Sequence, residues 1–246
     1  MNNSETYSFQ IQYYNLDFNE NITFTTLGNF ILHAAGNHAQ LLGFSIDNLF
    51  KQQKTWVLSR FYVVMDSYPK AGEILQIQTW VHSVETFFST RKFRLFSQSG
   101  KQIGNASSTW AVIDINTRRP YPLSNIISNL DYVNGFDSAI KLPERVTLDF
   151  APEMLVYSDK VKYSDMDINK HMTSMHYLEW ILDAFDLDFL KSHTLKSVEL
   201  NFLQELNFAE KVDVRLNKYE NFYYAELYNQ TNNASACKCK LFWESI

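Results

Sequence analysis

The fold of this chain is decided by the stretch Tyr163-Ser164-Asp165-Met166-Asp167-Ile168-Asn169-Lys170-His171, because the chain carries it twice. Near its start stands Tyr13-Tyr14-Asn15-Leu16-Asp17-Phe18-Asn19-Glu20-Asn21, which repeats the tyrosine, the aspartate, the asparagine and the apolar residues between them. The last polar position differs, since Asn21 stands where the second copy has His171. The repeat predicts a duplicated domain in which the second copy alone keeps a complete polar triad.

The same order of elements is predicted around each copy. A strand with alternating apolar residues runs through Tyr7 to Tyr13, and Thr25 or Thr26 begins a helix that ends before Gly43. Strands are then expected at Thr55–Asp66, Ile74–Val84, Ser89–Gln98 and Gln102–Ile115. In the second half a strand runs to Tyr163 and a helix covers Thr173–Leu190. Strands are again expected, at Leu195–Gln204, Lys211–Tyr219, Phe222–Tyr228 and Ala234–Glu244.

One strand, one long helix and an antiparallel meander in each half predict an α+β fold of two tandem hot-dog domains. We expect an N-terminal domain at 1–122, a linker at 123–152 with a short helix near Ser124–Leu130, and a C-terminal domain at 153–246. The alternative is an unrelated α+β protein with accidental repetition. The matched motif before each helix argues against that alternative.

Net charge, cysteine content and the lack of long apolar runs limit the possible partners and the cellular location. The 246 residues carry a net charge of −5, which argues against a nucleic-acid partner because phosphate binding needs a basic surface. Cys237 and Cys239 would share one face of a strand, where a disulfide would be strained, so we expect reduced thiols. The start of the chain shows no signal-peptide pattern and no apolar run approaches about 20 residues, so we expect a cytoplasmic location without membrane insertion.

Four polar residues are candidates for chemistry. Asp167, Asn169 and His171 alternate just before a predicted helix N-terminus, a setting that suits polarisation of a carbonyl and stabilisation of an oxyanion. Glu205 follows an apolar strand, where burial would disfavour its charged form and suit it to act as a base. Each residue also has an ordinary alternative role as a turn, cap or strand-end residue.

Other chemistries lack sequence support. The chain has no Gly-x-Ser-x-Gly elbow, no Gly-rich nucleotide-binding loop and no His-Glu-x-x-His motif. The pairs His33/His38 and His171/His176 are five apart, a spacing that does not place two metal ligands on one helical face. We therefore expect neither a metal nor a cofactor.

Over nearly its whole length the chain resembles the acyl-ACP thioesterases of plants and bacteria. In the first half the resemblance rests on Thr55–Arg60, Tyr68–Glu73, Thr79–Val81, Ser108–Trp110 and Asn116–Arg119. In the second half it rests on Asp165–His171, Tyr177, Trp180–Leu182 and Glu205.

The resemblance implies hydrolysis of the thioester between a fatty acyl chain and acyl carrier protein, with Asp167, Asn169, His171 and Glu205 as the catalytic group. The chain departs from the plant pattern at Leu206, where plant members often have cysteine, and at Thr173-Ser174, which replace an Asn-Asn pair. Which carboxylate is the base stays open, as does the choice between a monomer and a homodimer. The alternatives in function are an acyl-CoA thioesterase and a non-catalytic acyl-binding module.

Substrate contacts are expected mainly in the first half. The small residues Ala35 and Ala39 would leave room for an apolar tail between helix and sheet, and Trp56 lies in the resembling stretch Thr55–Arg60. Acyl carrier protein is acidic, so its docking surface should be locally basic. Lys92 and Arg94 would point to the outer face of their strand and are candidates for that surface, together with Arg118-Arg119.

Overall fold

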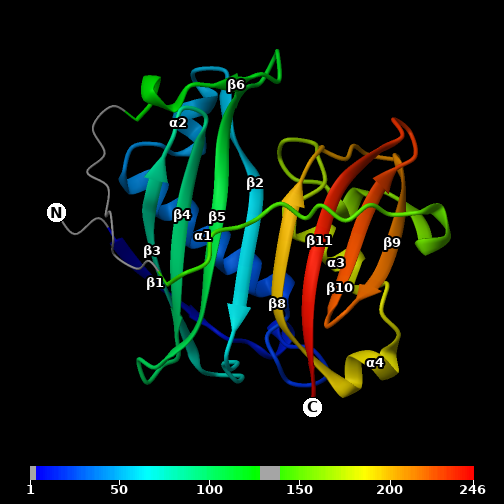
Figure 1. The fold of residues 1–246 in the computed structure, drawn as a ribbon. Helices are drawn as coiled ribbons and strands as arrows, with labels where there is room; N and C mark the ends of the chain where they lie inside the picture. Colours follow the sequence, from blue (N-terminus) through cyan, green and yellow to red (C-terminus); the bar gives the residue numbers. More distant parts are fainter. Residues whose placement is uncertain (1–3, 128–138) are drawn as a thin grey trace. The chain divides into compact units, whose positions relative to one another are not determined.

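The computed structural model describes residues 4–127 and 139–246. The chain forms two compact units, Met1–Pro143 and Glu144–Ile246, and Figure 1 traces each of them. Each unit pairs a helical segment with an antiparallel sheet, which confirms the predicted α+β class.

The first unit is built around one long helix and five long strands. Its elements are β1 (Ser4–Gln10), the 3-10 turn η1 (Tyr13–Asn15), α1 (Phe24–Leu41), α2 (Ile46–Phe50), β2 (Lys54–Met65), β3 (Ile74–Val84), β4 (Phe88–Phe96), β5 (Gln102–Asp114), β6 (Pro120–Tyr121) and η2 (Leu123–Asn125). The strands pair antiparallel in the order β1-β3-β4-β5-β2, and β6 adds to β5.

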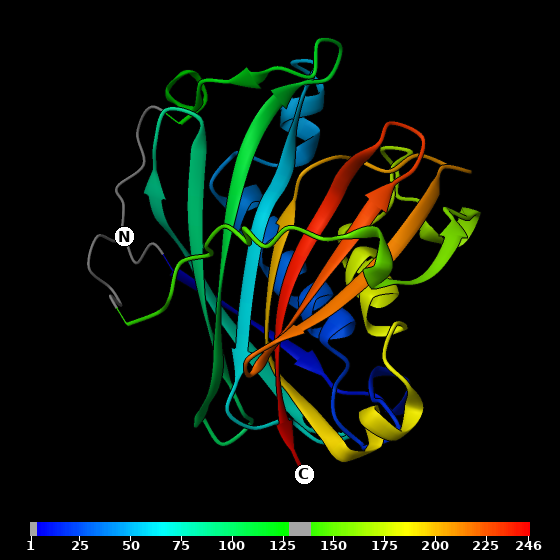
Figure 2. The same ribbon diagram turned by 45° about the vertical axis from the view of Figure 1, so that its right-hand side comes forward.

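The core of the first unit lies between α1 and one face of this sheet. α1 contacts β3 and β1 along that face (Figure 2), and Phe9 of β1 stacks on Phe30 of α1 at 4.6 Å between ring centroids. Because directly paired residues in antiparallel strands project to the same face, Phe9 fixes which side chains face the helix. Most of those side chains are buried and apolar, for example Leu75, Ile77 and Leu95.

The second unit repeats this order with a shorter helical segment. Its elements are η3 (Pro152–Met154), β7 (Leu155–Lys160), η4 (Tyr163–Asp165), α3 (Ser174–Leu182), α4 (Leu187–Ser192), β8 (His193–Phe202), β9 (Lys211–Tyr219), β10 (Phe222–Asn229) and β11 (Ala234–Ser245). The strands pair antiparallel in the order β8-β11-β10-β9-β7. The predicted long strands of both units are therefore confirmed to within two residues at their starts and ends.

The predicted helices differ from the structure in detail. Helix α1 is capped by Thr23, whose hydroxyl accepts the backbone N–H of Thr26 at 3.2 Å, rather than by Thr25 or Thr26. Gly43 follows the helix with a positive φ of 84°, a conformation that glycine adopts without strain, so the predicted stop is confirmed.

The expectation of one helix over Thr173–Leu190 is wrong. α3 ends at Leu182, and Asp186 starts the separate helix α4 by accepting the backbone N–H of Phe189 at 2.8 Å. A carboxylate at that position competes with the continuous helix for backbone donors, which explains the break.

The first strand is shorter than predicted. It ends at Gln10, and Tyr13 is 86% exposed in η1 instead of continuing the strand.

The segment that connects the two units is extended where it is described. Residues 141–150 contain no helix or strand, and of the short helix expected near Ser124–Leu130 the structure shows the 3-10 turn η2, while residues 128–130 lie outside the described residues. The backbone N–H of Val146 donates to Asn201 Oδ1 at 2.8 Å, and Lys238 donates to the Leu148 carbonyl at 2.8 Å. This part of the connection is thus fastened to the sheet of the second unit.

No helix within the described ranges is long and apolar enough to cross a membrane.

Candidate active site

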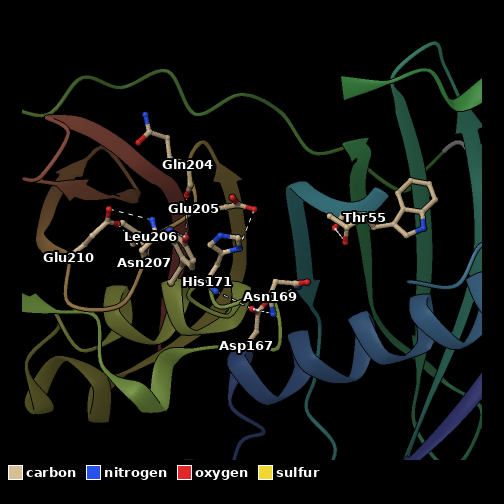
Figure 3. Close-up of polar contacts among 11 residues, drawn as sticks. Thr55, Asp167, Asn169, His171, Gln204, Glu205, Leu206, Asn207 and Glu210 are labelled. Carbon is tan, nitrogen blue, oxygen red and sulfur yellow. Dashed lines mark hydrogen bonds and ion pairs between the residues drawn. The ribbon is translucent and has the colours of Figure 1, made fainter. Parts of the chain in front are cut away.

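In the second unit the polar motif forms a tight loop between η4 and α3, and Asp167 organises it. Its Oδ1 accepts the backbone N–H groups of Asn169 at 2.8 Å and of His171 at 3.2 Å, while Oδ2 accepts the Asn169 side-chain amide at 3.2 Å (Figure 3). Lys170 occupies the left-handed region with a φ of 65°, which closes the turn. The loop places Asn169 and His171 just ahead of the first turn of α3.

The first unit builds the same loop from the first copy of the motif. Asp17 Oδ1 accepts the backbone N–H groups of Asn19 at 2.8 Å and of Asn21 at 3.0 Å, and Glu20 takes a φ of 60°. The shared geometry means that the aspartate shapes the loop in both units. What distinguishes the second unit is the side chain that the loop presents, His171 in place of Asn21.

His171 meets Glu205, which follows β8. The distance from His171 Nδ1 to Glu205 Oε1 is 3.5 Å, and the side chains are 24% and 38% exposed (Figure 3). The two chain segments are joined next to this pair, because the backbone N–H of Met172 donates to the Leu206 carbonyl at 2.8 Å. The structure therefore brings together the four candidate residues, Asp167, Asn169, His171 and Glu205, from two segments more than 30 residues apart in the chain.

Tyr177 of α3 holds the segment on both sides of Glu205. Its hydroxyl accepts the backbone N–H of Leu206 at 2.9 Å and donates to the Gln204 carbonyl at 3.2 Å. Tyr177 and Leu206 are both buried, and burial raises the pKa of the Tyr177 hydroxyl far above its usual range, so it keeps its proton. Tyr177 is one of the residues on which the resemblance rests, but this role was not predicted from the sequence.

A second anchor lies five residues after Glu205. Glu210 accepts the backbone N–H of Asn207 at 2.8 Å and the Asn229 amide at 2.9 Å. In the first unit Glu73 makes the matching bond with the backbone N–H of Lys70 at 2.9 Å.

The matching bonds of Glu73 and Glu210 allow the two units to be aligned residue by residue. Counted back from the anchoring glutamates, Tyr68 stands in the place of Glu205 and Pro69 in the place of Leu206. Counted from the shared loop, Leu27 stands in the place of Tyr177. The first unit therefore lacks the imidazole and the carboxylate, and it also lacks the hydroxyl and the N–H that hold that carboxylate in place.

One polar pair, Asp165 and His176, was not predicted from the sequence. Asp165, 6% exposed, accepts the backbone N–H of Lys162 at 2.7 Å and lies 3.2 Å from Nδ1 of His176. In the first copy Asn15 makes the equivalent bond with the Gln12 N–H at 2.9 Å. The available signal was the change from asparagine to aspartate within the motif, together with the histidine eleven residues later.

The residues expected to bind substrate lie in the first unit in different settings. Ala35 is buried on α1 and Ala39 is half-buried. Trp56 donates its indole N–H to the Phe44 carbonyl at 2.9 Å and packs against a small core of Leu49, Val112, Leu123 and Ile127. Arg94 is half-buried, with its guanidinium 5.7 Å from the centroid of the Trp80 ring.

The expectation that Lys92 lies on a solvated outer face is wrong. Its side chain is 2% exposed, so the described chain does not offer it to a docking partner. Arg118 and Arg119 are exposed, as expected. Alternation gives the face of a strand to which a side chain points, but it does not reveal what covers that face.

A metal site was not expected, and the described ranges contain no group of three or more His, Cys, Asp or Glu side chains that could hold a metal ion.

Models of two known protein domains match the sequence of this chain. The family model for the acyl-ACP thioesterase N-terminal domain matches residues 2–129, and that for the C-terminal domain matches residues 151–245. The chain belongs to the acyl-ACP thioesterase family. Both family domains are thus present in order, in agreement with the resemblance found from the sequence and with the tandem hot-dog fold.

Solved structures and curated proteins of the acyl-ACP thioesterase family extend the match. A crystal structure of an acyl-ACP thioesterase from Bacteroides thetaiotaomicron is 32% identical, with a TM-score of 0.90 over 99% of this chain and 98% of that one. The 12:0-ACP thioesterase from Umbellularia californica, 17% identical, shares the fold with a TM-score of 0.85 over 100% of this chain and 99% of that one. Oleoyl-acyl carrier protein thioesterase 1 of Arabidopsis thaliana, a chloroplast protein, is 26% identical over 83% of this chain and 61% of its own length. The chain thus spans about three-fifths of that relative's length.

Proposed function

We propose that this protein hydrolyses the thioester of a fatty acyl-acyl carrier protein and releases a free fatty acid. The observation that carries the proposal is the His171–Glu205 pair beside the helix α3, present in the second unit and replaced by Asn21 and Tyr68 in the first. Membership of the acyl-ACP thioesterase family supports the choice of substrate.

In this proposal Glu205, assisted by His171, takes the proton from a water molecule that attacks the thioester carbonyl. Asn169 and the free N–H groups at the start of α3 hold the carbonyl oxygen as it gains negative charge. The proton that Glu205 took from water then passes through the imidazole to the departing thiolate. Water adds to the carbonyl carbon and the carbon–sulfur bond breaks, so the acid and the thiol are the two products.

Glu205 is the better candidate for the base than Asp167. Both oxygens of Asp167 already accept hydrogen bonds within the loop, and Asp17 makes the same backbone contacts in the first unit, which lacks the histidine. Glu205 faces the imidazole and is partly open to solvent, where water can reach it. Asp167 then acts as a positioning residue for Asn169 and His171.

We further propose that the first unit binds the acyl chain. Counted from the capping residues Thr23 and Thr173, Ala35 and Ala39 stand at the positions of Phe185 and Phe189. In the second unit these two rings stack at 5.1 Å and pack against Tyr223 and Trp243. Alanine at both positions gives the first unit the smaller side chains that a bound tail requires.

A basic surface on the first unit is the proposed docking site for the acidic carrier protein. With Lys92 buried, the candidates that remain are the exposed Arg118 and Arg119 and the half-buried Arg94. We also propose a reducing, cytosol-like compartment, because Cys237 and Cys239 are free and buried on one face of β11.

The test is a panel of acyl-acyl carrier proteins and acyl-CoAs of several chain lengths, with release of free thiol as the measurement. We expect turnover of acyl-acyl carrier protein to exceed that of acyl-CoA. Glu205→Gln and His171→Ala should each lower kcat by roughly a hundred- to ten-thousand-fold. Asn21→Ala in the first copy is the matched control and should stay near wild type.

The other outcomes separate the alternatives. Preferential turnover of acyl-CoA would make the protein an acyl-CoA thioesterase. Tight binding of acyl substrates without turnover by the wild type would identify a non-catalytic acyl-binding module.

A further inference from the structure

The interior of the first unit contains a charged side chain where the second unit has aromatic packing. Arg91 of β4 is 7% exposed, and its Nη1 donates to His38 Nδ1 on α1 at 2.5 Å and to Thr79 Oγ1 at 3.3 Å. Strand pairing aligns Arg91 with Tyr223 of the second unit, a ring packed against Phe185 and Phe189. The first unit thus replaces an aromatic cluster with a buried cation beside small residues.

The charge of Arg91 is not balanced by a carboxylate among the described residues. The other buried arginine, Arg215, is 8% exposed and lies 3.0 Å from Glu226 and 3.6 Å from Asp213. The side chains that accept hydrogen bonds from Arg91 are instead those of His38 and Thr79. Burial and the nearby guanidinium lower the pKa of His38 to about 4, so His38 is neutral at pH 7 and leaves the positive charge in place.

One polar group near Arg91 is a donor that the protein does not use. The neutral His38 accepts from Arg91 at Nδ1 and so holds the guanidinium in place. The Tyr7 hydroxyl of β1 is buried without a hydrogen-bond partner. Its counterpart in the second unit, Tyr157, donates to the Trp180 carbonyl at 2.6 Å. A buried cation and a hydroxyl without an acceptor match an anionic oxygen.

Small side chains lie next to these donors. Ala34 and Ala35 precede His38 by four and three residues, so all three share the face of α1 that packs on the sheet. Gly28 and Leu27 continue that buried face toward the start of the helix. A ligand that fits this setting carries an aliphatic part along the alanines and a negative oxygen at Arg91.

We propose that Arg91, His38 and Tyr7 form a binding site for the carboxylate of an aliphatic monocarboxylic acid inside the first unit. The carboxylate accepts from Arg91 and from the Tyr7 hydroxyl and neutralises the buried charge, while His38 holds the guanidinium through Nδ1. The inference does not depend on the hydrolysis proposed above, although the product of that reaction belongs to the ligand class named here.

The experiment measures binding to the whole chain by isothermal titration and by the shift of the melting temperature. The probes are octanoate below its micellar concentration, octanol as the uncharged analogue and acetate as the short one, all at constant ionic strength. We expect saturable stabilisation by octanoate, with acetate and octanol at least tenfold weaker. Equal binding of octanol would overturn the role of the charge, and equal binding of acetate would overturn the aliphatic ligand class.

Variants test the named groups. Tyr7→Phe removes a hydroxyl that has no partner in the free protein, so it should leave the melting temperature unchanged and weaken octanoate binding by about tenfold. Tyr157→Phe is the matched control in the second unit and should bind octanoate normally. Unchanged octanoate binding by Tyr7→Phe would contradict the proposal.

The two buried arginines give a second contrast. Arg91→Met removes an unbalanced charge, so it should abolish octanoate binding without lowering the melting temperature of the free protein. Arg215→Met leaves Glu226 and Asp213 buried without their cation and should lower the melting temperature strongly. If Arg91→Met destabilises the free protein as much as Arg215→Met does, the guanidinium is a structural element and the proposed site is refuted.

Discussion

The hydroxyl of Tyr177 offers a direct way to test how the second unit positions Glu205. Tyr177→Phe removes one oxygen atom and keeps the ring, which packs edge-on to Phe202 at 5.5 Å. The lost oxygen is the acceptor for the Leu206 N–H at 2.9 Å and the donor to the Gln204 carbonyl at 3.2 Å. The variant therefore frees the backbone on both sides of Glu205 and leaves the core packing intact.

The structure sets the size of the expected effect. Leu206 is fully buried, so its N–H is left without a partner, which costs about 1–3 kcal/mol of the free energy of unfolding. A misplacement of about 1 Å at a reacting group lowers the rate by roughly a hundredfold. We therefore expect Tyr177→Phe to reduce kcat by roughly ten- to a hundredfold while KM changes little, because Tyr177 holds the proposed base rather than the substrate.

The assay is steady-state hydrolysis of one good acyl-acyl carrier protein substrate, measured as kcat and KM separately, alongside urea unfolding. Tyr157→Phe is the control, since its hydroxyl is also bonded to a backbone carbonyl in the same unit but holds Trp180 instead of Glu205. It should lose stability without losing kcat. If Tyr177→Phe loses stability but keeps a kcat within twofold of wild type, the hydroxyl does not position Glu205 for the reaction.

Three further predictions concern the first unit. Ala35→Phe should shift the product profile toward shorter acyl chains, because each methylene that can no longer be buried lowers the binding free energy by about 0.8 kcal/mol. An unchanged profile in a folded variant would show that the acyl chain binds elsewhere. Arg118→Glu should raise KM for acyl-acyl carrier protein, and more so at low salt. The same change at the exposed Lys51 should leave KM unchanged. Equal effects of the two changes would mean that Arg118 is not part of the docking surface. His38 should make the wild type about 2 kcal/mol less stable at pH 5 than at pH 7, because the unfolded chain binds its proton near pH 6.5 and the folded one only near pH 4. Urea unfolding at both pH values checks this, and His38→Gln should show a smaller loss.

Local pattern was enough to predict the elements that have a regular period. Strands such as Ile74–Val84 and Lys211–Tyr219 were predicted to the residue, because alternation of apolar side chains and flanking turn residues are local signals. The second helix was predicted too long. Its apolar stripe runs on past Leu182, and the pattern does not reveal that the Asp186 side chain caps a new helix.

The sequence by itself determined the repeat, the α+β class and the four polar candidates, because the two copies of the motif share their polar pattern and only the second copy ends it with a histidine, His171. Tertiary structure alone decided which of these residues meet. It showed that Asp167 is engaged in the loop, that Glu205 faces His171 at 3.5 Å and that Tyr177 holds the backbone beside it. It also buried Lys92 and placed Arg91 against His38. Burial and pairing depend on what packs over a side chain, and those neighbours come from segments that sequence spacing does not relate.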